Sequence, residues 1–272
     1  MKQSPVRFDA KDLKVQRFEA TSKDGTKIPY FVVAKNNLQL DGKNPTLLYG
    51  YGGFEVAMQP GYLSFIGKVW LERGGVYVLS NLRGGSEFGP EWHKAVLKEN
   101  RYKVYEDNIS IAEDLIARKI TSPEHLGISG RSNGGLLTGA TFTLRPDLFN
   151  AVIVGVPLLD MLRYHKLLAG ASWMAEYGDP DDPKMRAAIL KYSPYQKLSP
   201  TAKYPEVFIM TSTKDDRVHP GHARKMVAKM KEQGHPVYYY ENIEGGHAGS
   251  SNLEQAIQWN TLEYVYLWEK LK

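Results

Sequence analysis

The hexapeptide GRSNGG, residues 130–135, constrains the fold of this chain more than any other feature. It follows the apolar stretch HLGIS, typical of a buried strand, and precedes LLTGATFTL, a helix-forming stretch. We therefore predict a sharp strand-to-helix turn with Ser132 at its apex, where Gly130 and Gly134 let strand and helix pass without a collision of Cβ atoms. Ser132 becomes a candidate nucleophile. The alternative is a glycine-rich turn that merely begins a helix, because GxSxG also occurs by chance.

Strand-like and helix-like segments alternate through most of the chain, which predicts a mostly parallel sheet of about eight strands with helices on both faces. The first two strands are joined by the turn KDGT and should form an antiparallel hairpin at the sheet edge. The expected strands are residues 14–22, 27–35, 45–52, 76–81, 125–129, 151–157, 206–212 and 237–242. Apolar spacing predicts helices over residues 105–119, 221–234 and 251–271.

Composition excludes several classes of partner. The chain has 272 residues, a formal net charge of +5 and no cysteine. Without cysteine there is no disulfide, thiol catalysis or thiolate metal site. The lysines are scattered rather than gathered into a run, so we expect no nucleic-acid partner. The longest apolar run, residues 151–159, is far shorter than the roughly 18 residues of a membrane-spanning helix, so we expect no membrane partner.

The first 12 residues lack the apolar stretch of a signal peptide. We expect a cytoplasmic protein, and a periplasmic location stays open if a signal peptide has been removed.

Two further candidates follow predicted strands in the order that a serine nucleophile of this kind needs, first an acid and then a histidine. Asp215 and Asp216 come after the strand VFIMTS, and His247 lies in the glycine-rich loop after VYYYEN. Spacing does not choose between the two aspartates. The alternatives are an acidic turn that caps the next helix and an ordinary surface histidine, although the glycines around His247 argue against the latter.

Other chemistries have little support in the sequence. His219 and His222 lie three residues apart, but neither HExxH nor a clear third ligand accompanies them. No GxxxxGK[ST] phosphate-binding loop is present. We expect neither a metal nor a cofactor.

The motifs, taken together, resemble the catalytic domain of the prolyl oligopeptidase family of serine peptidases. Matching segments occur in family order through nearly the whole chain: SKDGTKIPYFVV, LLYGYGGF, NLRGGSEFG, EWHKA, TSPEHL, GRSNGGLL, RPDLFNAVI, DMLRYHK, WMAEYGD, KYSPY, KDDRV and GGHAG. The resemblance implies an α/β-hydrolase fold and a catalytic triad of Ser132, Asp215 and His247. It thereby selects the first aspartate of DDRV.

The resemblance also implies an oxyanion hole. Tyr51, the second tyrosine of LYGYGGF, would supply its hydroxyl, together with the backbone N–H of Asn133 at the helix N-terminus. The alternative for Tyr51 is a packing residue whose hydroxyl meets water.

Substrate-binding roles follow from the same resemblance. Phe54 and Trp173 would wall a pocket for a proline ring, with Tyr177 nearby, and Arg217 would bind a substrate carbonyl. Without the resemblance, Phe54 and Trp173 are better interpreted as core aromatics, and Arg217 could pair with Asp216 or Glu244.

Full-length members of that family carry a β-propeller before this region, which admits only short peptides, and a short N-terminal segment that packs on the hydrolase domain. The printed sequence starts about where the propeller would end. We therefore expect one hydrolase domain over residues 1–272, no propeller, an open site, and self-association into a homo-oligomer through the surface left exposed. Arg131 and His219 also differ from common family residues and could alter the pocket rim.

The resulting hypothesis is a serine hydrolase that cleaves acyl bonds through a covalent acyl-enzyme. Peptide or amide bonds after proline are the favoured substrates. A carboxylesterase acting on small or activated esters is the first alternative, and a catalytically silent binding protein is the second.

Overall fold

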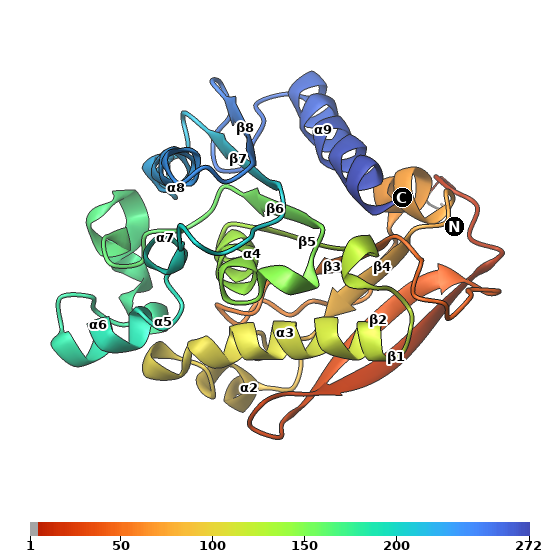
Figure 1. Ribbon diagram of the computed structural model, residues 1–272, viewed down its shortest axis with the longest axis horizontal. Coiled ribbons are helices and arrows are strands. Elements are labelled where there is room, and N and C mark those ends of the chain that lie inside the picture. Colours follow the sequence, from red (N-terminus) through yellow and green to blue (C-terminus); the bar gives the residue numbers. More distant parts are fainter. Residues whose placement is uncertain (1–4) are drawn as a thin grey trace.

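An eight-stranded sheet runs through the centre of the protein (Figure 1). The computed structural model describes residues 5–272, which include all eight strands. In their order across the sheet, the strands are β1 (Leu13–Thr21), β2 (Lys27–Lys35), β4 (Val76–Ser80), β3 (Thr46–Tyr49), β5 (Leu126–Arg131), β6 (Ala151–Gly155), β7 (Val207–Ser212) and β8 (Val237–Asn242). The predicted number of strands is confirmed.

The first two strands form the predicted antiparallel hairpin at the edge of the sheet. Their register runs from Leu13 opposite Lys35 to Thr21 opposite Lys27. β2 then pairs with β4 in antiparallel fashion, and all further pairs from β4 to β8 are parallel. The third predicted strand is too long, because β3 ends at Tyr49 and Gly52 has a φ of +63°, which takes the backbone out of the extended conformation.

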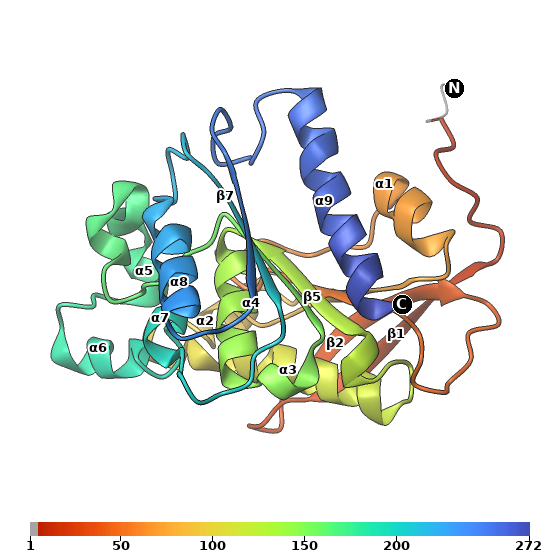
Figure 2. The same ribbon diagram turned by 45° about the horizontal axis from the view of Figure 1, so that its top comes forward.

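Helices cover both faces of the sheet (Figures 1 and 2). The long helix α9 lies on one side, and α4 and α8 lie on the other. The α-helices are α1 (Ser64–Ile66), α2 (Pro90–Lys94), α3 (Tyr102–Ala117), α4 (Asn133–Leu144), α5 (Met174–Tyr177), α6 (Pro183–Ile189), α7 (Pro194–Lys197), α8 (Gly221–Glu232) and α9 (Leu253–Leu271). A π-helix, η1 (Gly67–Leu71), follows α1, and short 3-10 helices are η2 (Lys98–Asn100), η3 (Pro123–His125), η4 (Pro146–Leu148), η5 (Tyr164–Lys166) and η6 (Leu168–Trp173).

Alternation along the strands divides the core into two layers. In β6, Val152 and Val154 pack in the layer beneath α3, α4 and α8, whereas Ala151 and Ile153 pack in the layer beneath η1 and α9. Because side chains alternate along a strand, an apolar run buried on both faces is what a central parallel strand requires. This explains why β6 (AVIVG) is wholly apolar and why β7 (VFIMTS) begins with four apolar residues.

The parallel strands also bring their carboxyl ends to one edge of the sheet. β5, β7 and β8 end at Arg131, Ser212 and Asn242, and the loops that follow carry Ser132, Asp215 and His247. Ligands of open α/β sheets bind at this edge. The fold therefore collects the three candidates from distant parts of the sequence.

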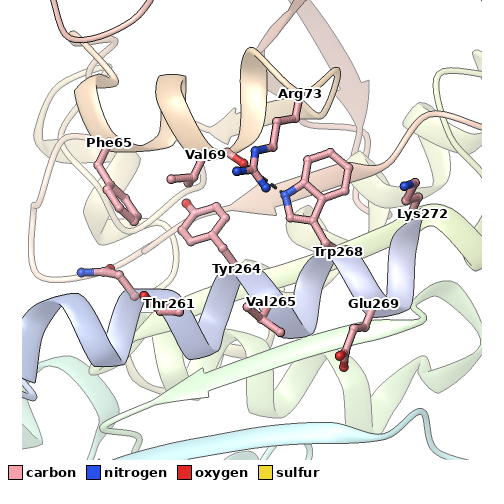
Figure 3. Close-up of a pocket in the computed structure, with 10 residues that line it drawn as sticks. Phe65, Val69, Arg73, Thr261, Tyr264, Val265, Trp268, Glu269 and Lys272 are labelled. Carbon is pink, nitrogen blue, oxygen red and sulfur yellow. Dashed lines mark hydrogen bonds between the residues drawn. The ribbon is translucent and has the colours of Figure 1, made fainter.

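A groove of about 760 Å³ lies elsewhere, between α1–η1 and the C-terminal half of α9 (Figure 3). Phe65, Val69, Tyr264 and Trp268 form much of its apolar wall, and Trp268 Nε1 donates a hydrogen bond to the Val69 carbonyl at 3.1 Å. It belongs to the α9 face of the sheet and contains none of the candidate site residues.

A buried histidine holds the segment that follows β6. His222 of α8 is 2% exposed, and its Nδ1 accepts the N–H groups of Leu159 at 3.3 Å and Asp160 at 3.1 Å. Burial is the main cause that lowers the pKa of His222 from 6.5 to about 4. The folded protein thus keeps this imidazole neutral at pH values where the unfolded chain protonates it.

We expect His222 to make the folded state less stable in acid. Its pKa is lower in the folded state, so its contribution is complete above pH 6.5 and is lost as the pH falls toward 4. The shift from 6.5 to about 4 corresponds to a loss of about 3 kcal/mol. The free energy of unfolding in urea is measured for wild type and His222→Gln between pH 7 and pH 4. Because both proteins contain the same carboxylates, the difference between their pH dependences gives the contribution of His222. If the two free energies of unfolding fall equally with pH, His222 makes no such contribution.

Candidate active site

Ser132 occupies a strained turn between β5 and α4. Its φ of 60° and ψ of −119° lie in a region that residues with a Cβ rarely adopt. Two backbone hydrogen bonds hold it there: Ser132 N–H donates to the Gly155 carbonyl at 2.9 Å, and Leu136 N–H donates to the Ser132 carbonyl at 3.0 Å. The predicted strand-to-helix turn is confirmed, and it presents the serine at the N-terminus of α4.

Close backbone packing explains the glycines around this serine. A Cβ on Gly130 would lie 2.2 Å from the Gly134 carbonyl oxygen, and one on Gly134 would lie 3.0 Å from the Gly50 carbonyl oxygen. The first of these contacts is impossible for any other residue without a backbone shift. The end of β5 can therefore pass the first turn of α4 only if residue 130 is glycine.

His247 connects Ser132 with Asp215. Its Nε2 lies 3.0 Å from Ser132 Oγ, and its Nδ1 lies 2.8 Å from Asp215 Oδ2 and 3.0 Å from Oδ1. The Asp215 side chain is fully buried, whereas Asp216 is exposed. Of the two aspartates that spacing left open, Asp215 is the one in contact with the histidine.

Backbone donors fix the carboxylate in turn. Asp215 Oδ1 accepts the N–H groups of Arg217 and Val218, each at 2.9 Å. A carboxylate held in this way favours a proton on His247 Nδ1, which leaves Nε2 free to accept the hydroxyl proton of Ser132. The arrangement is able to activate a serine hydroxyl.

Tyr51 and Asn133 lie on either side of the turn. The Asn133 side chain donates from Nδ2 to the Tyr51 carbonyl at 2.6 Å, and Asn133 is the first residue of α4, so its own backbone N–H has no acceptor in the helix. Burial is the main cause that raises the pKa of Tyr51 above 10, while Arg101 and a hydrogen bond with Ser132 act in the opposite direction. The Tyr51 hydroxyl therefore keeps its proton at neutral pH and is able to donate a hydrogen bond.

The aromatic residues of the expected pocket occupy two depths. Phe54 and Trp173 are half-buried and pack against the same core cluster. Tyr177 is completely buried, meets Phe54 edge-on with ring centroids 5.6 Å apart, and donates its hydroxyl to Asn133 Oδ1 at 2.7 Å. The Tyr177 ring therefore does not reach the surface, and its role in substrate binding stays a prediction.

Arg217 is exposed next to the Asp215 loop. Within residues 5–272, no carboxylate forms an ion pair with its side chain, and the suggested partner Glu244 instead accepts a hydrogen bond from Gln255. The guanidinium is therefore available to a ligand.

Arg131 packs beneath the loop that carries His247. Its guanidinium stacks on Trp259 of α9 at 4.5 Å from the ring centroid, and a Cβ on Gly249 would lie 3.0 Å from its Nη2. The residue before the serine thus contacts α9 and the His247 loop.

Sequence reasoning missed a buried polar cluster behind the site. Arg101 and Glu176, which are 1% and 4% exposed, form an ion pair at 2.7 Å, and His93 Nε2 lies 2.7 Å from the second Glu176 oxygen. Nothing in the sequence patterns marked these residues. Glu176 is the charged residue of the motif WMAEYG, but a glutamate at this position would also be expected on an exposed helix.

The histidines that the sequence offers as possible metal ligands have other partners in the structure. His222 and His219 accept backbone N–H groups through Nδ1, so each histidine has a structural partner. In the part of the chain that the structure describes, His165, Asp179 and Asp181 bring three ligand atoms within 4.8 Å of one another. Asp181 already pairs with the Lys166 ammonium group there, and the absence of a metal stays a prediction.

Comparison with known proteins decides the family. The model of the prolyl oligopeptidase family, a family of serine peptidases, matches residues 62–272. The chain belongs to this family. An uncharacterized peptidase of Sinorhizobium fredii is 58% identical over 268 residues, which cover 98% of this chain and 37% of that protein. A prolyl endopeptidase of Elizabethkingia miricola is 41% identical over 259 residues, with 94% of this chain and 37% of that protein covered.

Solved structures of prolyl oligopeptidase relatives share the fold. A post-proline cleaving enzyme from Rickettsia typhi is 43% identical with a TM-score of 0.94, over 100% of this chain and 40% of that one. Prolyl oligopeptidase B from Galerina marginata is 30% identical with a TM-score of 0.92, over 97% and 38%. The α/β-hydrolase fold is thus confirmed, and the chain spans less than half the length of these relatives. No helix in residues 5–272 is long and apolar enough to cross a membrane.

Proposed function

We propose that this chain is a serine peptidase domain in which Ser132 is the nucleophile, His247 the general base and Asp215 the residue that orients it. The observation that carries the proposal is the continuous hydrogen-bonded path from Asp215 Oδ2 through the imidazole to Ser132 Oγ. Three residue types in this order and geometry are the arrangement that activates a serine hydroxyl. The strained backbone of Ser132 supports the same role, because strain of this kind gathers at reactive positions.

In the proposed reaction, His247 Nε2 takes the Ser132 proton as Oγ attacks the acyl carbon. The imidazolium, stabilised by Asp215, then gives that proton to the leaving amine, and the acyl-enzyme forms. In the second half of the reaction, His247 Nε2 takes a proton from a water molecule as its oxygen attacks the acyl carbon. The imidazolium then gives that proton to Ser132 Oγ as the bond between Oγ and the acyl carbon breaks, and the acid product leaves. His247 makes every proton transfer in this scheme, so the proposed chemistry needs neither a metal nor a cofactor.

We propose that the Tyr51 hydroxyl and the Asn133 backbone N–H bind the oxyanion that develops on the carbonyl oxygen. The position of Tyr51 supports this role, because its carbonyl accepts a hydrogen bond from the Asn133 side chain at 2.6 Å and its half-buried hydroxyl stays protonated, as a donor must be. The free N–H at the start of α4 supports the second donor, and the positive end of the helix adds to it.

The proposed substrates are peptides or amides cleaved after proline. Half-buried Phe54 and Trp173 offer the flat apolar surfaces that suit a proline ring, and the exposed Arg217 would orient a substrate carbonyl. The names of the relatives, a prolyl endopeptidase and a post-proline cleaving enzyme, agree with this preference.

Substrate preference is tested with three chromogenic substrates: a blocked dipeptidyl-proline anilide, its alanine counterpart and a short acyl ester. We expect kcat/KM for the proline anilide to exceed that for the alanine anilide by 10-fold or more, roughly the value of one additional ring contact in an apolar pocket. Trp173→Ala should reduce this ratio while leaving the ester rate within a few-fold. A robust ester rate beside an undetectable anilide rate would establish a carboxylesterase instead.

Tyr51→Phe removes one proposed oxyanion donor and little volume. We expect kcat for the anilide to fall roughly 10²-fold with a small change in KM, because the donor acts mainly in the transition state. Tyr77→Phe on β4 is the matched control for loss of a buried tyrosine hydroxyl and should leave kcat unchanged. Equal kcat values for Tyr51→Phe and wild type would remove Tyr51 from the mechanism.

A further inference from the structure

We propose that Arg101 and Glu176 are positioning residues that hold the oxyanion hole and the proline pocket in one geometry, an inference that rests on the proposed function. Neither residue touches Ser132 or lies at the surface. Arg101 contacts the chain segments of the proposed oxyanion hole, and Glu176 contacts the backbone of the proposed proline pocket.

Arg101 binds the oxyanion side of the cluster. Its Nη2 donates to the Gly52 carbonyl at 2.7 Å and to Asn133 Oδ1 at 2.6 Å, and its Nη1 donates to Glu176 Oε1 at 2.7 Å. Gly52 directly follows Tyr51, so one guanidinium holds the chain segments of both proposed oxyanion donors. A rigid planar fork with several donors can do this, whereas an ammonium group cannot match the same acceptors.

Hydrogen bonding also fixes the carboxamide of Asn133. Its Oδ1 accepts from Arg101 and from the Tyr177 hydroxyl, while its Nδ2 donates to the Tyr51 carbonyl. A flipped amide would turn its NH2 group toward two donors and lose all three bonds. Asn133 therefore holds Tyr51 through its side chain, while its own backbone N–H is the first of α4.

Glu176 binds the pocket side of the cluster. Its Oε1 accepts the Phe54 N–H at 3.0 Å in addition to the Arg101 bond, and its Oε2 lies 2.7 Å from His93 Nε2. Phe54 and Glu55 have φ values of 55° and 58°, an uncommon conformation that costs free energy unless neighbouring groups hold it. The Glu176 carboxylate is one such group, because it holds the backbone N–H that aims the Phe54 ring.

Burial makes the pair sensitive to substitution. Although burial acts to lower the pKa of Arg101, neighbouring tyrosines and Glu176 raise it above its ordinary value, so the side chain stays charged. Removing one member leaves the other as an uncompensated buried charge, whereas replacing both by apolar residues of similar size is tolerated far better.

The test compares Arg101→Lys with wild type, after active sites have been counted by titration with a fluorophosphonate. Rates are then expressed per reactive serine, which removes any loss of folded protein. We expect kcat/KM for the proline anilide to fall roughly 10²-fold, the effect of a displacement of about 1 Å at a reacting centre. The affinity for an N-acylated prolinal, whose aldehyde adds Ser132 Oγ and places an oxyanion in the hole, should fall by a similar factor.

Arg83→Lys is the matched control. Arg83 is 4% exposed and pairs with the buried Asp107 and with Asp24, but its side chain has no bond to Gly52, Phe54 or Asn133. We expect this variant to lower the melting temperature and to leave the rate per site and the prolinal affinity within about two-fold of wild type.

A double variant, Arg101→Met with Glu176→Met, keeps the proposal testable if Arg101→Lys does not fold, since it leaves no unpaired buried charge. It should show the same parallel loss of anilide hydrolysis and prolinal affinity. Wild-type rates and affinities per site in either variant would overturn the inference alone. Wild-type protein that hydrolyses neither anilide nor ester would overturn the proposed function, and this inference with it.

Discussion

The close approach of β5 and α4 is the constraint on which the rest of the site depends. A Cβ at position 130 would lie 2.2 Å from the Gly134 carbonyl oxygen, so only glycine lets the chain turn so sharply there. The reversal forces Ser132 into its strained conformation and leaves the first N–H of α4 without a partner. The proposed nucleophile and the proposed oxyanion donor are thus adjacent residues whose geometry is set by backbone packing, and the sheet brings the proposed acid and base to them.

Periodicity and local turn chemistry were sufficient to predict the mostly parallel sheet and its N-terminal hairpin, whereas the α/β-hydrolase fold followed from the family resemblance. Apolar runs such as AVIVG and VFIMTS are long enough for strands buried on both faces, and the KDGT turn specifies the β1–β2 hairpin. The largest error in strand length is at β3, where Gly52 takes the backbone out of the extended conformation for a tertiary reason. Neighbouring chain segments pack against this stretch, and no pattern in the sequence reports them.

The site was only partly predictable for the same reason. Residue types and order predicted that Ser132 and His247 meet one of the two aspartates after β7, but selecting Asp215 over Asp216 required the family resemblance. Arg101 and Glu176 could not be found from periodicity, because a charged side chain is expected at the surface and its burial depends on contacts across 75 residues. The complete burial of Tyr177 also could not be read from the sequence, since it depends on packing against residues such as Phe54 that lie far away along the chain.

The central claim is that Ser132 is an activated nucleophile. Labelling the folded protein with a fluorophosphonate, followed by peptide mass spectrometry, tests it most directly, because the reagent requires an activated serine and mapping identifies which serine reacted. The account predicts about one label per chain on the peptide that contains Ser132, no label in Ser132→Ala, and strongly reduced labelling in His247→Ala. Folded wild-type protein that stays unlabelled, or that carries the label on another residue, would contradict it.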